Sequence, residues 1–215
     1  MLAAPINKLY VKVKSKFIGN YSNIIKAANV TAGSQLNPAD LAQIVGEVVS
    51  LPKRITTEER SYENLSLDNI QVGDTAIFSY RVIWNHQVVM KYNYATGKDE
   101  EDVVLHNSVW YRGEEYFRAD IMDIFAVIRD GNLTMLNNWV MVEDMEKPSV
   151  IVLPQRLSKI KNATKATLTH IYQNDLPEGD TVFCHPNKIQ HYAINEKKFG
   201  ILKQKDILGS LQMSE

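Results

Sequence analysis

The chain has 215 residues, of which 45% are hydrophobic and 23% charged, so it can bury one or two small cores and is not a disordered chain. Its formal net charge of −1 gives no electrostatic case for nucleic-acid binding, because neutralising phosphates needs clustered Lys and Arg. No apolar run approaches the ~20 residues that span a bilayer, and the start of the chain lacks a signal-peptide pattern. The single cysteine, Cys184, excludes an intramolecular disulfide. We therefore expect a cytoplasmic protein that binds neither nucleic acid nor membrane.

Strand patterns dominate from the start of the chain. Residues 9–14 alternate apolar and polar side chains, as a half-buried strand must. Residues 46–51 and 75–80 are rich in β-branched and aromatic side chains, which favour strands. Turn dipeptides punctuate the chain at Gly73-Asp74, Asp130-Gly131 and Gly179-Asp180. Many short strands and few helix signals predict an all-β protein built from small barrels or a sandwich.

Four segments of the first half have counterparts in the second half, in the same order. The pairs are residues 10–13 with 139–142, 46–51 with 166–171, 72–78 with 178–184, and 116–128 with 199–211. One shared Gly-Asp-Thr could arise by chance, but four collinear matches indicate a tandem duplication. We place the join near Asp130-Gly131-Asn132, which gives domains of residues 1–131 and 132–215.

The offset between matching residues shrinks along the chain. Tyr10 matches Trp139 at an offset of 129 residues, Gly73 matches Gly179 at 106, and Asp123 matches Asp206 at 83. The first half therefore carries extra residues before Gly73 and again in an enlarged hairpin region at 79–113. Length differences confined to connections are expected of one shared fold with variable loops.

Each half resembles the co-chaperonin (GroES-type) family. That family has a first strand, a flexible loop with an Ile-Val-Leu-like tripeptide, a Gly-Glu-Val strand, a Val-Gly-Asp-x-Val-x-Phe strand, a hairpin and a closing Asp-Ile-Leu strand. The second half matches these at residues 139–143, the loop 144–161, 166–171, 179–183, 184–198 and 200–211. The first half matches them at 9–14, the loop 15–43, 46–51, 72–78, 79–113 and 114–128. The resemblance covers nearly the whole chain and implies two tandem GroES-like β-barrels.

The resemblance also implies a function, that of a co-chaperonin that caps a chaperonin ring and assists ATP-dependent folding. Such a lid is not an enzyme and needs no cofactor. Its loops dock an apolar tripeptide on the chaperonin, so we predict Ile151, Val152 and Leu153 as binding residues, with Ile24 and Ile25 as the candidates of the first half. The resemblance further implies a homo-oligomeric ring, with the chaperonin ring as the partner.

Other interpretations stay open. The 151–153 tripeptide is also typical of a core strand, because short apolar runs are ambiguous, and the Ile24-Ile25 pair is also typical of a helix face or a core. The alternative function is a structural or assembly protein, for instance of a virus, that reuses the barrel without binding a chaperonin. Pro148 and Pro154 beside the tripeptide favour that alternative, since proline stiffens a loop, and so does the enlarged hairpin region.

The remaining reactive side chains form no catalytic or metal-binding pattern. The five histidines and Cys184 lack the spacing of a zinc site, and we find no phosphate loop or nucleophile elbow. We interpret the acidic run at 99–102 as a solvated loop tip. The aromatic residues of the first half are expected to fill its barrel and enlarged hairpin. They are Tyr62, Tyr80, Trp84, Tyr92, Tyr94, Trp110 and Tyr111.

Overall fold

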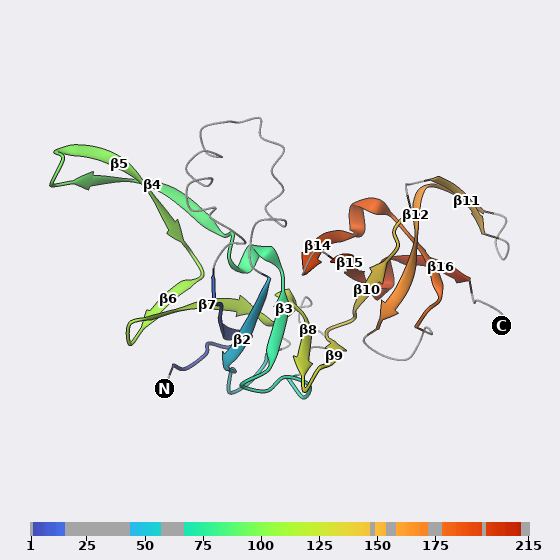
Figure 1. The fold of residues 1–215 in the computed structure, drawn as a ribbon, viewed down its shortest axis with the longest axis horizontal. Coiled ribbons are helices and arrows are strands. Elements are labelled where there is room, and N and C mark those ends of the chain that lie inside the picture. The colour runs from blue at the N-terminus through green and yellow to red at the C-terminus, as the bar shows by residue number, and fades with distance from the viewer. Residues whose placement is uncertain are drawn as a thin grey trace. The chain divides into compact units, whose positions relative to one another are not determined.

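The computed structural model describes residues 2–15, 44–56, 67–146, 149–153, 158–171, 178–194 and 197–211. Its regular structure consists of antiparallel strands with short 3-10 helices between some of them (Figure 1), which confirms the prediction of an all-β protein. Within these described ranges, no helix is long and apolar enough to cross a membrane.

The chain divides into two compact units, Met1–Ile124 and Phe125–Glu215. The sequence repeat places the join slightly later, between residues 131 and 132. That position is the turn between strands β8 (Ile124–Arg129) and β9 (Asn132–Met135), where Asp130 and Gly131 both have positive φ, 51° and 81°. Each unit is described by itself.

The first unit contains five strands of a seven-stranded sheet, in the order β6-β7-β1-β2-β3, and a separate two-stranded ribbon, β4–β5. The strands of the sheet are β1 (Lys8–Lys12), β2 (Val45–Ser50), β3 (Thr75–Phe78), β6 (Ser108–Tyr111) and β7 (Glu114–Asp120). The 3-10 helix η2 (Tyr80–Val82) follows β3, and η3 (Ile121–Asp123) follows β7. The ribbon, drawn in green in Figure 1, consists of β4 (His86–Asn93) and β5 (Lys98–Leu105).

The second unit has the strand order β14-β15-β10-β12-β13-β16, with β11 paired to β12 outside this path. Its strands are β10 (Trp139–Glu143), β11 (Ser149–Leu153), β12 (Ser158–His170), β13 (Thr181–Cys184), β14 (Gln190–Ile194), β15 (Lys197–Lys203) and β16 (Ile207–Leu211). The 3-10 helix η4 (Pro186–Lys188) follows β13, and η5 (Gln204–Asp206) follows β15.

The two units repeat one strand order. Strands β6-β7-β1-β2-β3 correspond, in chain order and in pairing, to β14-β15-β10-β12-β13. A 3-10 helix follows the same strand in each unit, after β3 and β13 and again after β7 and β15. A shared order of five strands with matching helical turns is what the tandem repeat of the sequence leads us to expect.

The register of the strands repeats as well. Gly46 lies opposite Ala76 in the first unit, and the equivalent residues Ala166 and Val182 lie opposite each other in the second. The matches of residues 46–51 with 166–171 and of 72–78 with 178–184 are therefore structurally equivalent.

The first strand aligns differently from our prediction. Val11 lies opposite Val48, whereas Val142 lies opposite Leu168, the residue equivalent to Val48, so β1 matches β10 at an offset of 131 rather than 129. The loops before these strands agree, because Asn7 and Asn138 have positive φ of 58° and 59°. The sequence cannot detect a slip of two residues, since strand side chains alternate with a period of two.

The Gly-Asp corner is the most similar local feature of the two units. In the first unit the Val48 amide donates to the Asp74 carbonyl at 2.8 Å and the Gly73 amide to the Val48 carbonyl at 2.8 Å. In the second unit Leu168, Asp180 and Gly179 form the same two bonds, at 2.9 and 2.7 Å. Gly73 and Gly179 have φ of 97° and 91°, a conformation that glycine adopts without strain.

One hydrogen bond at this corner differs between the units. The Gln71 amide donates to the buried Asp74 carboxylate, N···Oδ2 2.7 Å. The equivalent position in the second half is Pro177, and proline has no amide hydrogen. Among the described residues, the buried Oδ2 atom of Asp180 has no hydrogen-bond partner.

This difference predicts unequal effects of removing the two carboxylates. Asp74→Ala should destabilise its sheet by about 1 kcal/mol more than Asp180→Ala destabilises the second sheet, because Asp74→Ala removes the acceptor of the Gln71 amide, whereas Asp180 Oδ2 has no described partner to lose. Hydrogen exchange of the β3 and β13 amides in each variant measures the two effects separately. Equal losses of amide protection in the two variants would contradict this difference in hydrogen bonding between the two corners.

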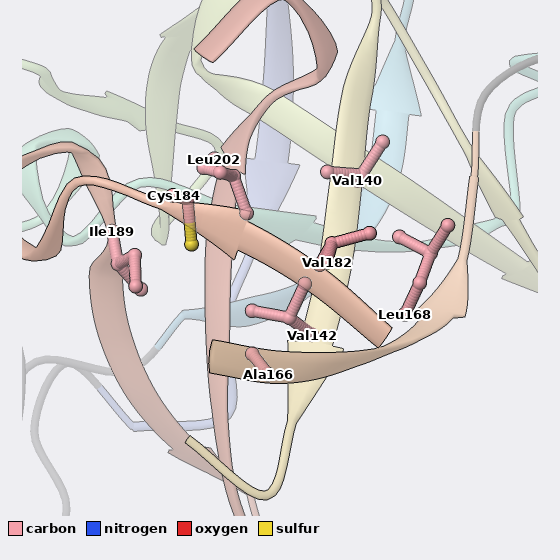
Figure 2. Close-up of a cluster of buried hydrophobic side chains, with 8 residues drawn as sticks. All are labelled: Val140, Val142, Ala166, Leu168, Val182, Cys184, Ile189 and Leu202. Atoms are coloured by element: carbon pink, nitrogen blue, oxygen red, sulfur yellow. The ribbon is translucent and has the colours of Figure 1, made fainter. Parts of the chain in front are cut away.

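The core of the second unit is a cluster of eight buried side chains (Figure 2). They are Val140, Val142, Ala166, Leu168, Val182, Cys184, Ile189 and Leu202. They come from strands β10, β12, β13 and β15 and from the residue after η4, so the cluster joins the elements that carry the sequence repeat. Strand β12 is therefore anchored at its C-terminal half by buried Ala166 and Leu168.

Candidate docking site

Strand β11 carries the predicted tripeptide Ile151, Val152 and Leu153. It pairs with the first part of β12, with Ile151 opposite Ile160, Val152 opposite Lys159 and Leu153 opposite Ser158. The same 13-residue strand pairs with β13 only from Thr164 onward. The β11–β12 hairpin is thus an extension of a strand whose other half is fixed in the sheet.

This arrangement corrects one expectation. We predicted a flexible loop over residues 144–161, but residues 149–153 and 158–161 are strands. The physical reason is local, because Val150, Ile151 and Val152 are three consecutive β-branched residues with high strand propensity. The tripeptide is therefore carried by a strand that lies off the main path of the sheet, rather than by an unpaired loop.

The first-half candidates Ile24 and Ile25 lie outside the described residues, as does the predicted loop from residue 16 to residue 43. The candidate docking site that can be described is therefore the β11–β12 hairpin alone.

The sequence pattern did not predict a second extension, the β4–β5 ribbon, with exposed apolar side chains. We expected its aromatic residues to be buried, but Tyr92 and Tyr94 are 50% and 91% exposed, and Met90 is 63% exposed. Trp110 of β6, also expected to be buried, is 68% exposed. A turn at Gly97, with φ of 67°, joins two eight-residue strands and is the signal that could have revealed the ribbon.

The tip of the ribbon is locally ordered. The Gly97 amide donates to the Asn93 carbonyl at 2.8 Å, and the Ala95 amide donates to Asn93 Oδ1 at 2.9 Å. The rings of Tyr92 and Tyr94 meet edge to face, with centroids 5.1 Å apart. The acidic run at 99–102, predicted as a loop tip, instead belongs to strand β5.

An exposed charged cluster joins β1 to β7. Lys12 Nζ lies 2.6 Å from Glu114 Oε1, and the Tyr116 hydroxyl donates to Glu114 Oε2 at 2.5 Å. The hydrogen bond from Lys12, followed by that from Tyr116, lowers the pKa of Glu114, while the bonds to Glu114 raise the pKa of both donors. The cluster is solvent-exposed, so it stabilises the strand pair weakly and has no buried group poised for catalysis.

Cys184 is the one thiol of the chain, and it lies in the core of the second unit. Its Sγ donates to the Thr164 carbonyl at 3.7 Å, and burial raises its pKa from 9.0 to about 11. Within the part of the chain that the structure describes, no group of three or more His, Cys, Asp or Glu residues could hold a metal ion. Cys184 is a core residue here, as its hydrophobic neighbours indicate.

This burial predicts how Cys184 reacts. A thiol-specific reagent should label it slowly in the folded protein, because both access and thiolate formation are suppressed, and rapidly once urea unfolds the second unit. Since the folded-state pKa is raised, the stability contribution of the neutral thiol is intact below pH 9 and is lost as the pH rises toward 11. The rate of Cys184 labelling, measured as a function of urea concentration at two pH values, tests both the burial of the thiol and the loss of stability at high pH. Fast labelling of the folded protein at neutral pH would contradict the burial.

No family model matches the chain, and no curated protein matches its sequence.

Proposed function

We propose that the protein is a co-chaperonin, made of two GroES-like β-barrel domains, that caps a chaperonin ring through the apolar strand β11. The observation that carries this proposal is the β11–β12 hairpin. Ile151, Val152 and Leu153 lie on a strand that, among the strands described, pairs with β12 alone and is off the main path of the sheet. The order of motifs in each half, which resembles the co-chaperonin family, supports the same conclusion.

The hairpin suits a reversible contact. Burying an aliphatic side chain in a partner's groove yields about 1.5–3 kcal/mol, while ordering a free loop costs about 1–2 kcal/mol per residue. In an unpaired loop these terms nearly cancel. A tripeptide already paired in a strand has lost part of that entropy before it binds, so a preorganised hairpin retains more of the burial energy.

Several chains in one ring would bind together. Linked contacts raise the avidity by ~10²–10⁴ through effective concentration, without new contacts. A weak contact at each hairpin then gives a lid that stays in place, yet leaves when a few contacts are lost. The number of chains must suit the partner's symmetry, since a chain with two domains cannot fill a ring of seven domain positions without leaving one over.

Mixing the protein with a GroEL-type chaperonin and ATP tests the proposal. Native mass spectrometry should detect a complex heavier than the chaperonin by a whole number of chains, and it should be absent without nucleotide. No heavier species at micromolar concentrations of both proteins would contradict the proposed function.

A second function, a structural or assembly protein, is favoured by one observation. The ordered β11–β12 pairing replaces the loop that a docking tether was expected to have. In that case the chain alone should assemble into large particles, and adding a chaperonin should not change their mass.

A further inference from the structure

The turn between β9 and β10 recurs in front of β1. The Trp139 amide donates to the Leu136 carbonyl at 2.9 Å. The Lys8 amide donates to the Pro5 carbonyl at 3.3 Å, which is the same bond at the offset of 131 that relates β10 to β1. The segment of residues 2–4 is therefore equivalent to the last three residues of β9.

Strand β16 is the equivalent of β8. Each starts directly after a 3-10 helix, η5 or η3, and the residues match at the offset of 83 found in the sequence. The Ile121 amide in η3 donates to the Asn7 carbonyl at 3.0 Å. The Gln204 amide in η5 donates to the Asn138 carbonyl at 2.9 Å. This repeated bond joins the offset of 83 to the offset of 131, so both alignments hold at the same place in each unit.

The two equivalent strands differ in what lies on their outer edge. Strand β9 pairs antiparallel with β8, with Ala126 opposite Met135 and Val127 opposite Thr134. Of the strands that the structure describes, only β13 pairs with β16. Strand β16 contains neither a charged residue nor a proline, the residues that usually protect an open strand edge.

The segment of residues 2–4 directs one side of its backbone into its own unit. The Leu2 carbonyl accepts a hydrogen bond from the Ser50 hydroxyl at 2.7 Å, and Ala4 forms a parallel bridge with Pro52. Successive residues of an extended chain direct their N–H and C=O groups to opposite sides, so those of the exposed Ala3 face away from this contact. That side of the segment can pair with another strand.

We propose that residues 2–4 of one copy of the chain pair antiparallel with β16 of a second copy, as β9 pairs with β8 within the chain. The occupant is a second copy because the chain carries both halves of this strand pair a second time, and in the described structure these two halves do not pair with each other. The two offsets fix the register. The opposed residues, with the second copy named last, are Ala4 and Gly209, Ala3 and Ser210, and Leu2 and Leu211.

The contact is head to tail and weaker than the β8–β9 pair. The Leu136 amide donates to the Phe125 carbonyl at 2.8 Å, but the equivalent Pro5 has no amide hydrogen. A head-to-tail contact repeats from copy to copy and gives open or closed assemblies rather than a single two-fold pair. We therefore expect assembly that grows with concentration and reverses on dilution.

Disulfide trapping tests this contact without a chaperonin, and so independently of the proposed function. Intact chains with Ala3→Cys, mixed with intact chains with Ser210→Cys under mild oxidation, should form a cross-linked pair that contains one chain of each. Opposed residues of an antiparallel pair lie about 5.5 Å apart at Cα, which a disulfide spans. The buried Cys184 should not compete.

The matched control for trapping mixes Ala3→Cys with Lys205→Cys, an exposed position in the same unit as β16. It should cross-link at least about tenfold more slowly, because position 205 lies outside the proposed strand pair. Equal rates in the two mixtures would overturn the proposal.

Sedimentation equilibrium of the intact chain measures the same contact without a covalent bond. Ala3→Pro should weaken self-association about tenfold, because proline removes the amide hydrogen that faces β16. Ala3→Val keeps that hydrogen and should change the dissociation constant by less than about threefold. A monomer at every concentration, or equal effects of the two substitutions, would overturn the proposal.

Discussion

Replacing Ile151, Val152 and Leu153 together by threonine should abolish stable capping of a chaperonin ring. Threonine is β-branched, so strand β11 should still form, while the apolar surface of the tripeptide is lost. Losing even ~4 kcal/mol of burial at one hairpin weakens that contact about a thousandfold, and avidity multiplies the loss over the ring. Native mass spectrometry with ATP measures the remaining complex.

A control variant removes three other exposed apolar side chains, Ile6, Val72 and Trp110, which are 44%, 61% and 68% exposed. Changing these to alanine should leave capping within about threefold, the scale of exposed side chains away from a contact. If both variants cap equally well, or fail equally, the hairpin is not the docking site. Circular dichroism of each variant establishes that the sheets persist.

Leu168→Ala should lower the free energy of unfolding of the second unit by about 2–5 kcal/mol. Leu168 is fully buried in the core cluster, and its amide and carbonyl hold the Gly179-Asp180 corner. The substitution leaves a cavity among side chains from four strands, which close packing cannot fill without strain. Urea-dependent labelling of Cys184, in the same cluster, reports the unfolding of this unit directly.

Lys165→Ala provides the comparison on the same strand. Lys165 is exposed and forms an ion pair with Glu146, Nζ···Oε1 2.8 Å, so its loss should cost less than about 1 kcal/mol. If Lys165→Ala shifts the urea midpoint of Cys184 labelling as far as Leu168→Ala does, the core assignment of strand β12 is wrong.

The sequence predicts the strands of the repeat because alternation and turn glycines are local signals. Gly73 and Gly179 sit at equivalent corners, and residues 46–51 and 166–171 have equivalent registers. The sequence alone aligns β1 with β10 two residues away from the alignment that the strand pairing shows. A shift of two residues preserves the pattern of buried and exposed side chains, so the sequence pattern cannot reveal it. Only backbone pairing, with Asn7 and Asn138 in equivalent turns, resolves that slip.

The candidate site is predicted less well. The order of motifs points to Ile151, Val152 and Leu153, but the expectation of a loop leaves out the strand propensity of the β-branched run from Val150 to Val152. The exposure of Tyr92 and Tyr94 could not be read from the sequence, because aromatic residues usually lie in cores. Whether such residues are buried depends on what packs over the ribbon, which is a tertiary property.

Hydrogen exchange of the intact chain, with and without a GroEL-type chaperonin and ATP, tests the docking site most directly. We expect slower exchange of the β11 amides, residues 149–153, and of the first part of β12 when the chaperonin and ATP are both present. Strand β3, far from the hairpin in sequence, should be unchanged. Unaltered exchange in β11 within a chaperonin complex, with slowing confined to other strands, would contradict it.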